Sequence, residues 1–162
     1  MKKYKFISYK NNFAKLFLKE KSRLEKILPK CEIEHIGSTA VPNLGGKGII
    51  DVLIIMPKEN LKKAEKILFS KYKIMRTVSN KERISFKKDY WKFLGKRRVH
   101  IHLTYPKSKT HKETIKFRNN LRRSKKLRED YSKLKKEAVR IADNKGSVYR
   151  KLKESFMIKN SI

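Results

Sequence analysis

The sequence predicts an α/β (α+β) fold in which a mixed β-sheet core follows an N-terminal helix and precedes a helical tail. Apolar residues recur at helical spacing over residues 11–29 and stop before Pro29, which is typical of an amphipathic helix. Residues 49–56 are apolar apart from one aspartate, which indicates a central strand covered on both faces. Residues 98–105 alternate between polar and apolar side chains and end at a proline, which predicts another strand.

The remaining segments predict further strands in the core and helices in the tail. The second tail helix has an apolar stripe formed by Leu127, Tyr131, Leu134, Ala138 and Ile141. The other predicted elements are strands at 31–36, 72–78 and 83–94, a helix at 59–70, and helices that open near Thr110, Ser124 (as N-cap) and Gly146.

The chain carries a formal net charge of +30 on 162 residues, and this charge is spread along its length. Residues 1–106 contribute +17 and residues 107–162 contribute +13, and lysine outnumbers arginine 34 to 11. Two interpretations remain open: a lysine-rich solvated surface of the kind that codon bias produces, or a surface that binds nucleic acid. We expect one domain over 1–162, with the α/β core at about 1–106 and the helical tail at about 107–162.

Composition also argues against several classes of protein. No stretch approaches the roughly 20 apolar residues that a membrane-spanning helix needs, so we expect no membrane partner. The first residues lack the continuous apolar segment of a secretion signal. Cys31 is the single cysteine, which leaves no disulfide framework or thiolate metal cluster and favours a cytoplasmic location.

Glycines gather between two of the predicted strands, where residues 37–48 hold four of the six in the chain. Gly37 and Ser38 directly follow the first of these strands. Glycine lets a ligand approach the backbone, and a helical turn that begins near Ser38 would direct N–H groups at an anion. We therefore predict that Gly37, Ser38 and Thr39 bind phosphate.

Asp51 is the acidic residue in the apolar run that follows. An ionised carboxylate among apolar neighbours is costly unless it is paired, hydrogen-bonded or bound to a metal. Asp51 is therefore a candidate ligand of a divalent ion, Mg²⁺ or Mn²⁺, and the Gly37-Ser38 corner and the acid together suit a phosphate and a metal ion. We take Asp51 and Ser38 as the candidate catalytic residues. The alternative, in which Asp51 caps a loop or pairs with Lys47, stays open.

His100 and His102 are two residues apart on a predicted strand and therefore project to one face of it. If that strand neighbours the strand bearing Asp51, the three residues form a two-histidine, one-carboxylate metal site. Such a set favours Zn, Mn or Fe over Mg. In the alternative interpretation, the histidines are sheet residues that are hydrogen-bonded to their neighbours.

Cationic side chains near these segments are candidates for binding the phosphates of a nucleotide. Lys47 lies within the glycine-rich segment, and Arg97 and Arg98 directly precede the strand with the two histidines. Arg83 and Arg118 are further candidates.

The segment His-Ile-Gly-Ser-Thr-Ala-Val-Pro, followed by Lys47 and Ile-Ile-Asp51, resembles the signature of the GrpB family. That family is similar to the polymerase-β-type nucleotidyltransferases, whose pattern is Gly-Ser, a spacer, and then Asp-x-Asp or Asp-x-Glu. The resemblance runs nearly end to end, through the strand His100-Ile-His102 and the helical tail. It implies a nucleotidyltransferase-like mixed sheet, a divalent metal ion as cofactor and a nucleoside triphosphate as substrate.

The sequence departs from the superfamily pattern at one position. A second carboxylate is expected at residue 53, on the same strand face as Asp51, but the residue there is Leu53. A single aspartate can hold one ion together with water and substrate phosphates, but hardly two.

Three functions are consistent with these observations. The resemblance implies a metal-dependent nucleotidyltransferase with an unidentified acceptor. Leu53 favours a non-catalytic protein that binds a nucleotide or another phosphorylated small molecule. The charge favours a basic protein associated with nucleic acid.

Overall fold

The computed structural model describes residues 6–92, 95–142 and 146–160, and for residues 77, 91–92 and 95–97 it describes the backbone alone. Up to residue 104 its regular elements are strands interspersed with helices, and thereafter they are all helical. In chain order they are α1 (Asn12–Glu25), β1 (Glu32–Ile36), the 3₁₀ turn η1 (Ser38–Ala40), β2 (Ile50–Ile55), α2 (Lys58–Phe69), β3 (Lys73–Ile74), the 3₁₀ turn η2 (Arg76–Val78), β4 (Ile84–Lys92), β5 (Gly95–Thr104), α3 (Lys109–Arg123), α4 (Lys125–Ala142) and α5 (Gly146–Lys159).

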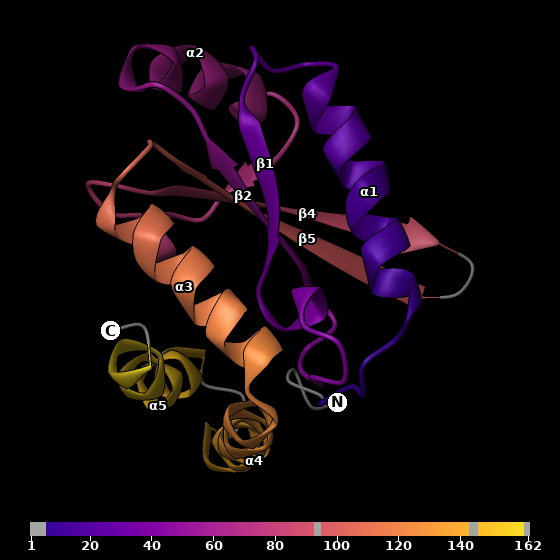
Figure 1. The fold of residues 1–162 in the computed structure, drawn as a ribbon. Helices are drawn as coiled ribbons and strands as arrows, with labels where there is room; N and C mark the ends of the chain where they lie inside the picture. Colours follow the sequence, from indigo (N-terminus) through magenta and orange to yellow (C-terminus); the bar gives the residue numbers. More distant parts are fainter. Residues whose placement is uncertain (1–5, 93–94, 143–145, 161–162) are drawn as a thin grey trace.

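The strands form one mixed sheet in the order β1-β2-β5-β4-β3 (Figure 1). Strands β2 and β5 are parallel, and every other neighbouring pair is antiparallel. Because parallel neighbours need a crossover connection, α2, β3 and β4 all lie between β2 and β5 in the sequence. The register of this parallel pair sets Asp51 opposite His100 and Leu53 opposite His102.

One face of the sheet is apolar and is covered by α1 and α2. Side chains alternate along the strands, so Val52, Ile54 and Ile101 all point to this face and are fully buried. Leu24 of α1 and Leu68 of α2 belong to the same apolar cluster. Burial of each such side chain contributes roughly 1.5–3 kcal/mol, so this layer holds the helices to the sheet.

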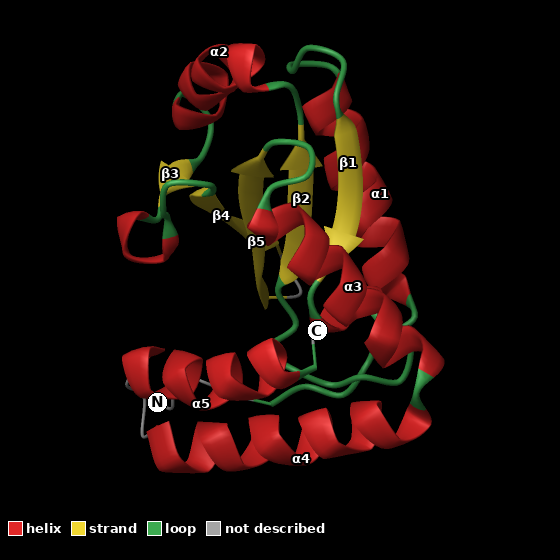
Figure 2. Ribbon diagram, turned by 60° about the vertical axis from the view of Figure 1, so that its left-hand side comes forward, coloured by secondary structure: helices red, strands yellow, loops and turns green. Residues whose placement is uncertain are grey.

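The opposite face is divided between an apolar and a polar part. Over β1 and β2, Ile36 and Leu53 pack against Ile115 of α3, which lies across the sheet from α1 (Figure 2). Over β4 and β5, the same face carries polar side chains, among them Ser85 and His102. The apolar contacts of α3 therefore stop where the polar part of the face begins.

The helical tail continues from α3 into α4 and α5, which lie side by side at one end of the sheet (Figure 2). The hydroxyl of Ser124 accepts a hydrogen bond from the Leu127 amide at 3.1 Å, which confirms the predicted N-cap. The predicted apolar stripe fails at its last member, because Ile141 is 49% exposed and Ala142 is buried instead. A 3.5-residue repeat drifts around a 3.6-residue helix, and this drift moves the buried position by one residue.

Two predicted elements are shorter in the structure, and β5 begins at Gly95, three residues before the predicted start at 98. The predicted end of the strand at 83–94 lies outside the described residues. Helix α1 ends at Glu25, before the predicted end near Pro29, and the chain continues in a turn whose amides bind the Leu24 carbonyl. The predicted strand at 72–78 shortens to the two residues of β3, because the backbone then curls into η2. The predicted fold class, an α/β fold in which a mixed sheet follows an N-terminal helix and precedes a helical tail, is confirmed. Among the described residues, no helix is both long enough and apolar enough to span a membrane.

Candidate functional site

The candidate site begins at the corner between β1 and η1. Gly37 ends the strand with φ +72°, in the left-handed region that glycine adopts without strain. A β-carbon built on Gly37 would collide with the carboxylate of Asp51. Glycine is therefore required here both by the backbone conformation and by the close approach of the acid. The exposed backbone of Gly37 thus lies directly beside the Asp51 side chain.

Asp51 and two histidines meet on the polar face of the sheet. Because β2 and β5 are neighbours, Asp51 of β2 lies beside His100 of β5, and His102 lies on the same face. The Oδ1 atom of Asp51 is 3.3 Å from Nδ1 of His100 and 3.8 Å from Nε2 of His102. The three side chains are 23%, 17% and 14% exposed, so the cluster is recessed but reachable from solvent.

Burial and hydrogen bonding set the charge of this cluster. Burial alone would raise the pKa of Asp51, but hydrogen bonds and charge from His100 and His102 hold it well below its usual range. Burial lowers the pKa of His102. At neutral pH the cluster therefore combines an ionised carboxylate with a neutral His102 ring, and these are the forms that bind metal ions.

Ser85 supports the cluster from the next strand. Its hydroxyl lies 2.9 Å from Nδ1 of His102, so the opposite ring nitrogen, Nε2, faces Asp51. A hydrogen bond of this kind fixes the tautomer and orientation of a ligating histidine. Sequence reasoning missed Ser85, although a hairpin register between the strands at 83–94 and 98–105 pairs it with His102.

The donor set of Asp51, His100 and His102 fits a single divalent ion. One ligand atom from each residue lies within 4.8 Å of the others. In the described part of the chain, this cluster has Asp51 as its sole carboxylate. Leu53 points to the same face but is fully buried against Ile36 and α3, so it leaves no second acidic group beside Asp51. Imidazole donors suit Zn, Mn and Fe better than Mg.

The predicted phosphate-binding loop is built partly from its own internal contacts. The Thr39 side chain is buried; its hydroxyl lies 3.0 Å from Nε2 of His35 and donates to the Ile49 carbonyl at 3.0 Å. Ser38 is half-buried, and its hydroxyl packs against Gly46, where a β-carbon would collide with it. The structure therefore leaves Ser38 at the edge of the site and places the Thr39 side chain in the interior.

The predicted phosphate-binding cations Lys47 and Arg98 make different contacts in the structure. The ammonium of Lys47 lies 3.6 Å from the ring centroid of Tyr149 in α5, and burial, aided by repulsion from Lys153, lowers its pKa to about 7. Arg98 forms a two-pronged pair with Asp89 at 2.6 and 3.1 Å. The side chain of Arg97 lies outside the described residues.

Two other arginines are committed to contacts within the fold. Arg118 binds the carboxylate of Glu34 and the carbonyl of His35. Arg83 donates to the Val78 carbonyl at 3.1 Å, and its buried Nε has no hydrogen-bond partner among the described residues.

Lys135 of α4 is a buried cation that sequence reasoning did not single out. It is 2% exposed, donates to the Gly45 carbonyl and lies 4.7 Å from the ring centroid of Tyr131. Burial lowers its pKa to about 7. The signal for it was its position one helical turn after Tyr131, which places it beside the apolar stripe of α4.

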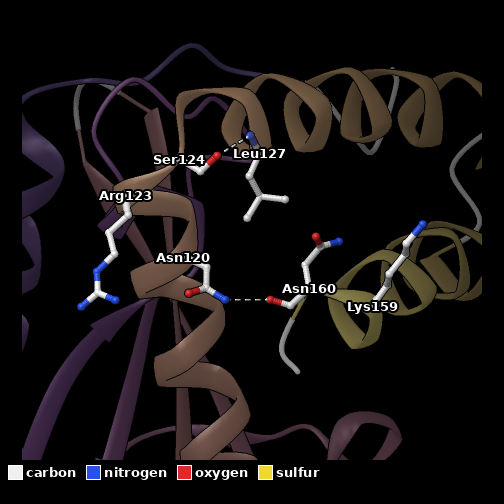
Figure 3. Close-up of a pocket in the computed structure, with 6 residues that line it drawn as sticks. All are labelled: Asn120, Arg123, Ser124, Leu127, Lys159 and Asn160. Carbon is white, nitrogen blue, oxygen red and sulfur yellow. Dashed lines mark hydrogen bonds between the residues drawn. The ribbon is translucent and has the colours of Figure 1, made fainter.

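Two cavities lie apart from the histidine cluster. One, of about 400 Å³, lies where α3 meets α4, and Asn120 there donates to the Asn160 carbonyl (Figure 3). The other, of about 390 Å³, lies between the start of α1, the loop around η1, and the junction of α3 with α4.

Comparison with known proteins gives a consistent set of matches. A family model described as GrpB protein matches residues 4–161. The glutamate-rich protein GrpB of Alkalihalophilus pseudofirmus is 29% identical over 159 residues, which cover 93% of this chain and 90% of that protein. UPF0157 protein YqkA of Bacillus subtilis is 30% identical over 84% of this chain and 40% of its own length. UPF0157 protein VC_A0354 of Vibrio cholerae is 34% identical over 42% of this chain and 36% of its own length. The matches thus span less than half the length of the last two relatives.

Solved structures show the same relationship at the level of the fold. The crystal structure of the conserved protein GrpB from Enterococcus faecalis superposes with a TM-score of 0.76 at 25% identity, covering 96% of this chain and 98% of that one. A chain of the GLD-2/RNP-8 complex superposes with a TM-score of 0.54 at 15% identity, covering 88% of this chain and 58% of that one. This second likeness shows a shared fold alone.

Proposed function

The chain belongs to the GrpB family, and we propose that it binds a nucleoside triphosphate with one divalent metal ion and transfers the nucleotidyl group to an acceptor. The observation that carries the proposal is the convergence of Asp51, His100 and His102 beside the exposed Gly37 corner. A nucleotidyltransferase-like fold supports the class of reaction. We also propose a cytoplasmic location, where nucleotides are abundant and a lone cysteine stays reduced.

Each residue of the proposed site has a role that follows from its chemistry. Asp51, His100 and His102 would hold the ion, and Ser85 would keep the Nε2 atom of His102 directed at it. The exposed backbone of Gly37 leaves room for phosphate oxygens beside these ligands. When bound, the ion would neutralise phosphate oxygens as negative charge develops on them. Between Mg²⁺ and Mn²⁺, the imidazole donors favour Mn²⁺.

Lys47 would contribute positive charge to the site, since its ammonium interacts electrostatically with Asp51. It is half-buried, so water screens its charge less than it would screen an exposed lysine, and a nearby phosphate group would be attracted more strongly. Its lowered pKa of about 7 means that a bound anion would also favour its protonated form. Binding of a triphosphate is therefore expected to take up protons at this residue.

A second candidate function, nucleotide binding without transfer, is favoured by Leu53. A two-metal site holds the attacking and leaving oxygens in line, and it needs carboxylates that bridge the ions. Leu53 provides none, and its burial against α3 makes an acidic replacement costly. The two candidates share one binding site and differ in whether pyrophosphate is released.

The binding step is tested by calorimetric titration of ATP, CTP and GTP with Mn²⁺, with Mg²⁺ and with EDTA. We expect binding that requires the metal, and we expect Asp51→Ala to weaken it at least about tenfold, as the loss of one charge-assisted contact does. Asp130→Ala is the matched control, because it removes an exposed aspartate of α4. Failure of every triphosphate to bind with either ion would overturn both candidates.

The transfer step is tested by measuring pyrophosphate release from the bound triphosphate with RNA, protein and small-molecule acceptors. Release that is lost in Asp51→Ala supports nucleotidyl transfer. Metal-dependent binding without release with any acceptor assigns the second candidate in place of the first.

A further inference from the structure

A second concave site lies on the α1 side of the loop around η1. His35 lines it, and the register of β1 with β2 turns His35 away from the face that carries Asp51. The ring of His35 instead stacks on Phe17 of α1, with a centroid distance of 4.5 Å. The cavity of about 390 Å³ therefore lies on the other side of the loop from the histidine cluster. Figure 1 shows the start of α1, η1 and the end of α3 near one another at this edge of the molecule.

Two arginines line this cavity from the junction of α3 and α4. Arg122 donates from Nε to the Ala40 carbonyl at 3.0 Å. Arg128 donates from Nη1 to the carbonyls of Leu121 and Arg122, each at 2.9 Å. Both guanidinium groups are thus held by main-chain carbonyls, and most of their N–H donors make no hydrogen bond with the described residues.

The two arginines of this cavity have no paired carboxylate among the described residues. No acidic residue lines it, and within residues 6–92, 95–142 and 146–160 neither arginine forms an ion pair with a carboxylate. Arg118, one helical turn before Arg122, does have such a partner in Glu34. Arg122 is exposed to solvent, and burial of part of its side chain together with the charge of Arg118 lowers its pKa, whereas the charge of Glu34 acts in the opposite direction.

We infer that this cavity binds the phosphate group of a small phosphorylated molecule, held between Arg122 and Arg128. The guanidinium fork matches the geometry of phosphate oxygens, and two such groups suit a dianion. The volume is within the roughly 300–1,000 Å³ of small-molecule sites and exceeds what a phosphate alone would fill. Tyr9 and Pro42 form part of the wall and provide apolar surface for the rest of the molecule.

The other cavity, of about 400 Å³ and lined by Asn120 and Asn160, differs from this one in how its cations are arranged. It also contains two cations, but Arg123 and Lys159 lie at opposite ends of it and point away from each other (Figure 3). Arg123 adjoins Arg122 in the sequence and carries the same charge, yet it does not line the second site. Arg123→Ala therefore controls for the loss of one positive charge at this end of α3.

The test is binding of inorganic phosphate and of ribose 5-phosphate, followed by calorimetry and ³¹P NMR in EDTA at about 0.15 M salt, where exposed charges are screened. EDTA removes any contribution of the metal cluster. We expect saturable binding of one molecule, with ribose 5-phosphate the tighter ligand. Arg122→Ala and Arg128→Ala should each weaken it about tenfold or more, as loss of a charge-assisted contact does. Arg122→Lys should also weaken it, because lysine keeps the charge but not the fork.

Arg123→Ala and Asp51→Ala should bind these probes as the unmodified protein does. Equal weakening by Arg122→Ala and Arg123→Ala would mean that net charge alone attracts the probe, and would overturn the inference. An RNA oligonucleotide that displaces ribose 5-phosphate, binds more tightly than it does and is itself bound more weakly by Arg128→Ala would assign the site to nucleic acid and overturn the small-molecule assignment. If Arg122→Ala does not fold, Arg128→Ala and Arg122→Lys carry the test. Failure here leaves the metal site untouched, because Asp51→Ala tests that site separately.

Discussion

At the scale of single residues, Gly37 and Asp51 form one structural unit. The carboxylate occupies the space that a β-carbon on Gly37 would fill, and Gly37 has φ +72°. Gly48 shares the positive φ, at +68°, but a β-carbon there would meet the flexible end of Ile7 at 3.1 Å. The two glycines thus have the same backbone requirement, and Gly37 alone of the pair contacts the acid.

This difference leads to a prediction for Gly37→Ala and its control Gly48→Ala. Both should lower the free energy of unfolding by about 1–2 kcal/mol, because alanine is strained at positive φ. Gly37→Ala should lower it further, because its β-carbon collides with the Asp51 carboxylate. Gly37→Ala should in addition weaken Mn²⁺ binding about 10–100-fold, because the new β-carbon would push the Asp51 carboxylate out of place. Changes to residues that position a metal ligand usually have an effect of this size. Urea unfolding measures the first effect and calorimetry with Mn²⁺ the second. Equal Mn²⁺ affinity in the two variants would contradict the predicted contact.

At the scale of elements, the two faces of β1 and β2 separate the acid from the interior histidine. Asp51 points to the polar face with His100, whereas His35 points to the apolar face beside Phe17. Burial lowers the pKa of His35 to about 4, so the ring is neutral near pH 7. Its contact with Thr39 then links the end of β1 to η1.

A pH dependence of folding follows for the junction between β1 and η1. The unfolded chain protonates His35 near its ordinary pKa of 6.5, whereas the folded chain does so only near 4. Stability from this residue is therefore complete above pH 6.5 and is lost as the pH falls from 6.5 to about 4, by an amount on the order of 3 kcal/mol.

Urea unfolding of the unmodified protein and of His35→Gln between pH 7 and about pH 4.5 measures this effect. The difference in unfolding free energy between the two should shrink as the pH falls, since the variant lacks the buried imidazole. His111→Gln is the control, because it removes a histidine at the start of α3, away from the β1–η1 junction. If the difference in unfolding free energy stays constant across this pH range, the pKa of His35 in the folded chain is not lowered, and the prediction is wrong.

At the scale of the whole molecule, a net charge of +30 on 162 residues acts against the compact state. Like charges repel across the surface, and the described ion pairs involve a minority of the 45 basic residues. The same charge attracts anionic ligands to every face of the molecule, so binding of triphosphates should combine a specific contribution with a general one.

The general contribution predicts an effect of salt on folding. Raising NaCl from about 0.01 M to about 0.15 M shortens the screening length from about 30 Å to about 8 Å, so the repulsion weakens and the free energy of unfolding should increase. Urea unfolding at these two concentrations measures the change, and urea adds no ions of its own. Chloride is the appropriate anion, because phosphate or sulfate would also occupy the proposed Arg122–Arg128 site. Stability that stays constant or falls with NaCl would mean that paired charges dominate the surface.

Much of the site was predictable because its residues are close in sequence or alternate along a strand. The segment from Gly37 to Asp51 reads as strand, glycine corner and strand, and the spacing of His100 and His102 puts both on one face. The order of the strands could not be read in the same way, since β5 lies beside β2 although 39 residues separate Ile55 from Gly95.

The sequence by itself determined the fold class, the glycine corner, the acid within an apolar strand and the absence of a carboxylate at Leu53, because each depends on local spacing and residue type. Only the tertiary structure decided that β2 pairs with β5, that Ser85 binds His102, and that Lys135 and Arg122 reach the glycine-rich loop. These contacts join residues 17 to 90 positions apart. They depend on how whole elements pack. The free energy of that packing is distributed over many side chains, so it cannot be read from any single motif.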